Sequence, residues 1–231
     1  MKGMKMIAVG LCAAMVTMGC NNMQKGAGIG AAGGALLGAI VGKMAGNTAV
    51  GAAVGGAVGA GAGAIIGKKM DKAKAEAEAV QNAQVESVTD ANGLQAVKVT
   101  FDSGILFNSG SSTLSTTAKN SLTQFSNVLK GNADCDVAIQ GYTDNAGWKN
   151  STAEQSVQKN LQLSQQRANS VSTYLKSLGV STNQIRSVDG FGEANPVADN
   201  STAAGKAQNR RVEVYMYASQ KMIQEAEAQA N

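Results

Sequence analysis

Two hydrophobic patterns occur in the second part of the chain, where most of the large apolar residues lie. Short apolar or alternating runs predict strands at 94–102, 135–143, 185–196 (a strand followed by a turn) and 209–218. Helical spacing predicts two helices that end at Gly131 and Gly179, the first after an extended stretch at 105–107. Their inward residues are expected to be Leu114, Ala118, Leu122, Phe125 and Leu129 in the first helix, and Leu161, Ala168, Val171, Leu175 and Leu178 in the second.

The predicted order is β-α-β-α-β-β. Each helix and each strand has one apolar face that it must bury, and a sheet with both helices on one face satisfies this need. We therefore expect an α+β fold, a two-layer α/β sandwich with a mixed sheet.

A different pattern precedes this region. Glycines stand four residues apart in two ladders, at Gly30, Gly34, Gly38, Gly42 and Gly46, and at Gly51, Gly55, Gly59, Gly63 and Gly67. Such spacing places each ladder on one helix face, where small residues allow two helices to approach closely. We expect a helical hairpin at 26–67 that inserts in a membrane or self-associates. A disordered linker rich in glycine and alanine is the alternative.

The first 20 residues are typical of a secretory leader. Lys2 and Lys5 precede an apolar run that is too short to span a bilayer with those flanks. The "MGC" that follows resembles a bacterial lipoprotein signal, although Thr17 stands where leucine is usual. This resemblance implies lipidation of Cys20 and, because no acidic residue follows it, delivery to the outer membrane. An ordinary secreted protein cleaved nearby is the alternative.

Composition excludes several kinds of site. The chain has no histidine, which removes His-dependent nucleophilic catalysis and zinc ligand sets with imidazole. The net charge of +4 is small and no basic stripe with interleaved aromatics is present, so nucleic acid is not an expected partner. Cys135 is expected to be an unpaired, partly buried thiol. We expect no cofactor, no metal and no enzyme activity.

Four segments together resemble the OmpA-like C-terminal domain, a peptidoglycan-binding module of outer-membrane proteins and lipoproteins. They are "ILFNSGSSTLS", "GYTDNAG", "NLQLSQQRANSVSTYL" and "GFGEANPVADNSTAAGKAQNRRVEV". The resemblance covers residues 94–217, and the preceding glycine zipper is similar to that of envelope lipoproteins of the YiaD type. The expected division is 1–19 signal peptide, 20–25 lipidated N-terminus, 26–67 hairpin, 68–93 helical or tethering linker, 94–217 OmpA-like domain and 218–231 tail.

The resemblance also implies a ligand, the diaminopimelate side chain of the peptidoglycan stem peptide, which carries an ammonium and a carboxylate on one carbon. It assigns Asp144 to the ammonium and Arg167 to the carboxylate, since a guanidinium forks onto a carboxylate. Asn160 is implied as an amide contact and Asn108 as a weaker, mainly backbone contact. On the residues alone, Asp144 could instead form a turn or a salt bridge with Arg167, and Asn160 could cap a helix.

One segment departs from the family pattern. The stretch between Asp144 and Asn160 is longer than usual and contains Trp148, the only tryptophan. Ser151 and Glu154 could form a capping box of an added helical turn. Trp148 could border the pocket or pack on the helix, and the role of segment 147–159 stays open.

Two functions follow as hypotheses. In the first, the protein tethers the outer membrane to peptidoglycan without catalysis, with its domain facing the periplasm. In the second, the glycine hairpin builds a homo-oligomeric membrane element that the OmpA-like domain only localises. Arg210 and Arg211 of "NRRVEV" are expected to have structural roles, and Gly190, Gly192 and Pro196 to shape a turn.

Overall fold

The computed structural model of the protein describes residues 58–90 and 93–230. Five strands form one mixed sheet in the order β1-β2-β5-β3-β4. The strands are β1 (Ala83–Thr89), β2 (Gln95–Asp102), β3 (Cys135–Gly141), β4 (Ile185–Gly190) and β5 (Arg211–Ala218). The helices are α3 (Ala60–Glu78), α4 (Ser103–Leu106), α5 (Thr116–Gly131), α6 (Ala153–Ser177), α7 (Ala203–Asn209) and α8 (Gln220–Ala230).

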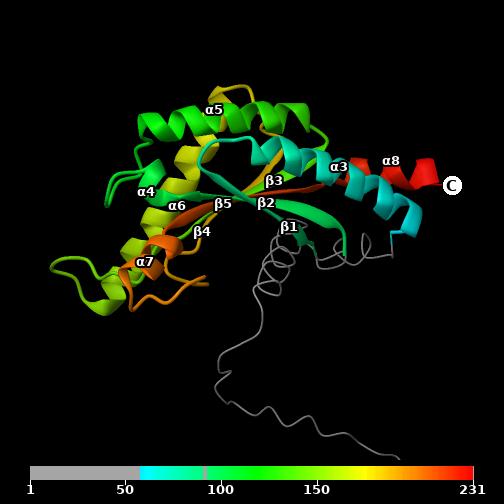
Figure 1. Cartoon of the computed structure of the whole chain (residues 1–231). Helices are drawn as coiled ribbons and strands as arrows, with labels where there is room; N and C mark the ends of the chain where they lie inside the picture. The colour runs from blue at the N-terminus through cyan, green and yellow to red at the C-terminus, as the bar shows by residue number, and fades with distance from the viewer. Residues whose placement is uncertain (1–57, 91–92, 231) are drawn as a thin grey trace, which may run out of the picture.

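The strand pairing explains the mixed sheet. β2 pairs antiparallel with β1 and β5, and β5 pairs antiparallel with β3. β3 and β4 are parallel, so the chain must cross over between them, and α6 makes this connection. Helices α3, α5, α6 and α8 all lie on one face of the sheet (Figure 1). The predicted α+β sandwich with helices on one face is confirmed.

The core forms where this helical layer meets the sheet. In β2, Val97, Val99 and Phe101 alternate with more polar residues and point toward the helices, as a period of two requires. Phe101 contacts Phe125 of α5 edge to face, with ring centroids 5.6 Å apart. Ala118, Leu122, Phe125 and Leu129 are buried as predicted. The stretch expected to be extended at 105–107 is different, because Ile105 lies in α4 and only Phe107 forms a bridge, with Leu114.

The orientation of α6 differs from the prediction at its first turns. Leu161 was expected to face inward but is 42% exposed, whereas Leu163 and Ser164 are buried. The reason is a close approach between α6 and the sheet. A Cβ atom on Gly141 would lie 2.2 Å from the Ser164 carbonyl oxygen, and one on Gly190 would lie 2.3 Å from the Gln165 backbone nitrogen. Small residues at this contact set the rotation of α6, so that Leu161 points outward.

The folded unit is larger than the expected 94–217, and the expected tether is part of it. β1 adds a strand at the edge of the sheet, and α3 buries Ile66 and Met70 in the common core. Lys69 of α3 also forms an ion pair with Asp134, with Nζ and Oδ2 2.7 Å apart. The prediction that residues 68–93 form a tether is therefore wrong, because the apolar residues of this segment pack on the sheet.

The C-terminal segment 218–231 is likewise not a free tail. Its helix α8 buries Met222 and Ile223 in the core and packs against α3. A Cβ atom on Gly61 of α3 would lie 2.9 Å from the Cβ of Ala230. The two ends of the described chain thus lie side by side (Figure 1).

The expectations for the N-terminal region fall mainly outside the described residues. These are the signal peptide at 1–19, the lipidated segment 20–25 with Cys20, and the hairpin up to residue 57. The last part of the second glycine ladder is described, and from Ala60 onward it forms the first turns of α3. Within 58–90 and 93–230, no helix combines the length and the apolarity that a membrane crossing requires.

Candidate functional site

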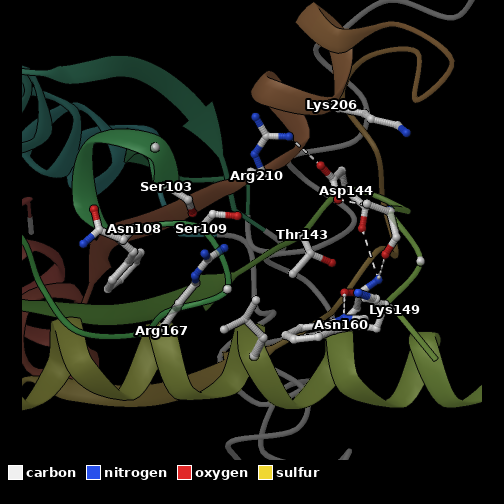
Figure 2. A pocket seen from close by; sticks show the side chains of 17 residues that line it. Ser103, Asn108, Ser109, Thr143, Asp144, Lys149, Asn160, Arg167, Lys206 and Arg210 are labelled. Atoms are coloured by element: carbon white, nitrogen blue, oxygen red, sulfur yellow. Dashed lines mark hydrogen bonds and ion pairs between the residues drawn. The ribbon is translucent and has the colours of Figure 1, made fainter. Parts of the chain in front are cut away.

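A pocket of about 740 Å³ opens at the end of the sheet where β3 ends and β5 begins. Four parts of the chain line it: α4 and the loop after it, the loop from β3 to α6, the inner face of α6, and the junction of α7 and β5 (Figure 2). All four predicted ligand residues, Asn108, Asp144, Asn160 and Arg167, belong to its lining. The fold therefore brings together residues that are far apart in the sequence.

Asp144 lies three residues beyond the end of β3 and is buried, with 7% of its surface exposed. Its Oδ2 accepts a hydrogen bond from a terminal nitrogen of Arg210, and its Oδ1 accepts from the backbone N–H of Ala146. The structure thus assigns the ion pair of Asp144 to Arg210 rather than to Arg167. A carboxylate has about four lone-pair positions, so these contacts leave room for another donor.

Arg167 lies on the inner face of α6 and is 3% exposed. Its Nε donates to the carbonyl oxygen of Ser111 at 3.0 Å, and its guanidinium lies over the ring of Phe107, 5.1 Å from the centroid. Burial, and then the charge of Arg210, lowers the pKa of Arg167 below its usual value. Within the described part of the chain, its two terminal nitrogens make no hydrogen bond, so both remain available to donate to a ligand.

Asn160 holds the loop between β3 and α6. Its Oδ1 accepts a hydrogen bond from Trp148 Nε1 at 2.7 Å, and its Nδ2 donates to the carbonyl oxygen of Ala146 at 3.2 Å and to Glu193 Oε2 at 3.1 Å. It lies well inside α6 and does not cap a helix. It also lines the pocket, and although its amide already has several protein partners, its role toward a ligand stays a prediction.

The added segment before Asn160 extends α6 toward its N-terminus. The helix begins at Ala153 with a capping box formed by Thr152 and Gln155, one residue after the predicted pair of Ser151 and Glu154. Ser156 in the added turns accepts from the backbone N–H of Trp148 at 3.0 Å. Trp148 therefore does both things that the sequence left open, since it borders the pocket and bonds to α6.

Two buried hydroxyl groups in the pocket, Ser103 Oγ and Thr143 Oγ1, have no hydrogen-bond partner within residues 58–90 and 93–230. Their residues are only 1% and 4% exposed. Buried polar groups are almost always hydrogen-bonded, and an exception needs an explanation. A ligand or water that enters the pocket would supply the missing partners. Asn108, by contrast, is exposed at the side of the pocket away from Asp144 (Figure 2), and its carbonyl oxygen accepts from Ser111 N–H.

The adjacent arginines of "NRRVEV" have different environments. Arg211 is 3% exposed, bonds to Glu213 through Nε at 2.7 Å, and stacks on Tyr142, so its predicted structural role agrees with the structure. Arg210 instead lines the pocket and pairs with Asp144. Sequence reasoning missed Arg210, Lys149 and Lys206 as pocket residues. Only the resemblance of "NRRVEV" to the family pattern could have drawn attention to Arg210.

The site and fold can now be compared with known proteins. The model of the OmpA family matches residues 106–210, which include Asn108, Asp144, Asn160, Arg167 and Arg210. The chain contains an OmpA family domain. A second model, the YMGG-like Gly-zipper, matches residues 1–71.

Relatives of the chain include a lipoprotein and a peptidoglycan-binding protein. The chain is 46% identical over 110 residues to the Probable lipoprotein YiaD of Escherichia coli. The match covers 48% of this chain and 46% of that protein. It is 43% identical over 93 residues to the Peptidoglycan-binding protein ArfA of Mycobacterium bovis. This match covers 40% of this chain and 26% of that protein. The chain thus aligns with less than half of the length of either relative.

Among solved structures, the fold is similar to the cell wall anchor of the T6SS from Pseudomonas aeruginosa. The TM-score is 0.52 at 26% identity, and the match covers 65% of this chain and 97% of that one. The predicted family and fold are therefore confirmed. The ligand roles of the four pocket residues remain predictions.

Proposed function

We propose that this protein is a non-catalytic tether that binds peptidoglycan through the pocket of its OmpA family domain. The observation that carries the proposal is the pocket itself, in which a buried carboxylate, Asp144, and a buried guanidinium with free terminal nitrogens, Arg167, face one space. A relative and a solved neighbour whose names refer to peptidoglycan binding and to a cell wall anchor support the same class of ligand.

The chemistry matches diaminopimelate, whose free end carries an ammonium and a carboxylate on one carbon. Asp144 would receive the ammonium on its remaining lone pairs, while Arg167 would donate its two terminal N–H groups to the carboxylate. Arg210 would hold Asp144 in place through their ion pair. Ser103 and Thr143 would find partners among the ligand's polar atoms.

The protein would be held at the outer membrane by lipid on Cys20, with the OmpA family domain in the periplasm. Each buried methylene of an acyl chain contributes about 0.8 kcal/mol, so a cysteine with several chains anchors firmly. Helix α3 packs on the domain and does not add to the length of a free tether.

Sedimentation of the purified full chain with peptidoglycan sacculi in a non-ionic detergent tests this function. Asp144→Asn and Arg167→Gln should each weaken retention about tenfold or more, because each removes a charge-assisted contact of about 1.5–3 kcal/mol. Arg186→Gln is the matched control, since Arg186 pairs with Asp136 and does not line the pocket. Free meso-diaminopimelate should compete, whereas a stem peptide with lysine at that position should not. Undiminished retention of both pocket variants would refute the assignment.

One observation favours the second candidate function, an oligomeric membrane element built by the glycine zipper. Gly63 of α3 and Gly59, the residue before this helix, face open space among the described residues, because a Cβ atom on either would meet no described atom within 4 Å. Extraction of a Cys20→Ala variant separates the two candidates. A fully soluble variant excludes insertion by the hairpin, whereas retention in the membrane favours the second candidate.

A further inference from the structure

The charges around the pocket do not balance. Four cationic residues line it, Lys149, Arg167, Lys206 and Arg210, against a single anionic residue, Asp144. Arg210 is already paired with Asp144. Glu193, the nearest other carboxylate to Asn160, bonds to that amide and is not part of the lining. Among the described residues that line the pocket, three cations therefore have no anion to balance them.

A single amino-acid end of diaminopimelate would not restore the balance. Its carboxylate and ammonium have no net charge together, and they would occupy Arg167 and Asp144. Figure 2 shows Lys149 and Lys206 at the Asp144 side of the pocket, away from Arg167 and Asn108. Neither lysine has an ion pair or a side-chain hydrogen bond among the residues that the structure describes.

The added segment fixes the loop that carries Lys149. Its neighbour Trp148 is anchored at two points, by the bond from Nε1 to Asn160 and by the bond from its backbone N–H to Ser156. Lys159 of the same segment is used differently, since its Nζ bonds to Ser151 at 2.8 Å and lies over the Trp148 ring. Lys206 lies on α7, which ends just before Arg210, and it belongs to the pocket lining.

We propose that Lys149 and Lys206 form a second anion subsite, which binds another free carboxylate of the same stem peptide. This inference rests on the proposed function and deepens it. Two carboxylates of the stem have suitable chemistry, the α-carboxylate of its D-glutamate, next to diaminopimelate on one side, and the C-terminal carboxylate of a D-alanine on the other. The subsite makes the pocket selective for stem peptides in which that one carboxylate is not amidated.

Titrations of the full chain in detergent with three synthetic tetrapeptides test the proposal. The peptides are L-Ala-γ-D-Glu-meso-diaminopimelate-D-Ala, its D-glutamate α-amide and its C-terminal amide. The fluorescence of Trp148, the only tryptophan and a pocket residue, reports binding. The free acid should bind more tightly than one of the amides, by up to about fivefold for each lysine contact, and the weaker amide identifies the carboxylate.

Lys149→Gln and Lys206→Gln should reduce this preference without changing the affinity for the discriminated amide. Lys119→Gln, an exposed lysine of α5, should leave the preference intact, and high salt should narrow it. Equal binding of all three peptides by the unmodified chain, or a preference that survives in both lysine variants, would overturn the second subsite. If Asp144→Asn still abolishes binding in that case, the proposed function stands. No binding of the free acid would refute both.

Discussion

Two neighbouring regions of the molecule contain similar kinds of side chains, arginine, carboxylate and hydroxyl, but differ in whether these groups have partners within the chain. On the sheet face opposite the helices, Arg211 and Glu213 form a buried ion pair, and Tyr215 donates its hydroxyl to Glu213 Oε2 at 2.6 Å. At the pocket, Arg210 pairs with Asp144, but Thr143 has an unpartnered hydroxyl.

This difference distinguishes a cluster that stabilises the fold from a pocket that is suited to bind a ligand. In the cluster of Arg211, Glu213, Tyr215 and Tyr142, the charged groups have their partners within the chain, including the carbonyl oxygens of Asn195 and Asn209. In the pocket, the charges are in excess and two hydroxyls are unsatisfied. Buried polar groups without partners are costly, so the pocket is arranged for something from outside the chain.

The largest expected contrast is in stability. Arg211→Met should lower the free energy of unfolding by about 3–5 kcal/mol, because it leaves the buried Glu213 carboxylate without its cation. Arg210→Met should change it by about 1 kcal/mol or less, since the Arg210 side chain is 38% exposed. Urea unfolding followed by circular dichroism measures both. Equal losses in the two variants would show that the two regions do not differ in this way.

A smaller contrast comes from removing one hydroxyl in each region. Tyr215→Phe should cost about 1.5–3 kcal/mol, because Glu213 loses a donor to a charged oxygen. Thr143→Val has nearly the same shape as the original residue and removes a hydroxyl without a partner, so stability should stay the same or rise. The same unfolding experiment applies. A Thr143→Val variant as unstable as Tyr215→Phe would indicate that Thr143 has a partner in the folded protein.

The third prediction concerns the stability of the fold in alkali, where the buried tyrosines of the cluster matter. At neutral pH the effect is negligible. Burial, followed by the charge of Glu213, raises the pKa of Tyr142 and Tyr215 above the ordinary value of 10.0. Above that pH the unfolded chain releases these protons while the folded chain retains them, so stability should fall as pH rises. Phenolate absorbance of these residues should appear only together with loss of the circular dichroism signal. Ionisation within an intact fold would contradict the burial of these two hydroxyl groups.

Much of the fold could be predicted because its elements have strong local signals. The strands of the domain core and the inward face of α5 follow from hydrophobic periodicity. The edge strand β1 and the packing of helix α3 on the sheet were missed because the apolar signal of both segments is weak. β1 alternates mostly polar residues with Ala83 and Val85, and α3 buries chiefly alanines besides Ile66 and Met70. Whether such segments pack depends on a surface that exists only after the rest has folded.

The candidate site shows the same limit. Asn108, Asp144, Asn160 and Arg167 were assigned from resemblance, and the structure places all four around one pocket. Their distant partners could not be inferred, since Arg210, which pairs with Asp144, is 66 positions away in the sequence, and Ser111, which bonds to Arg167, is 56 positions away. Trp148 likewise could not be placed, because its bond to Asn160 depends on where the added turns of α6 begin.

The sequence by itself determined the α+β class, the main strands and helices, and the residue types available to a zwitterionic ligand, because hydrophobic period and side-chain chemistry are local properties. Only the tertiary structure decided that Arg210 rather than Arg167 pairs with Asp144, and that Asn160 is occupied in holding a loop. It also decided that Lys149 and Lys206 share the pocket. These outcomes depend on which atoms the packing of α6 against β3 and β4 brings within hydrogen-bonding distance, and no local pattern encodes that geometry.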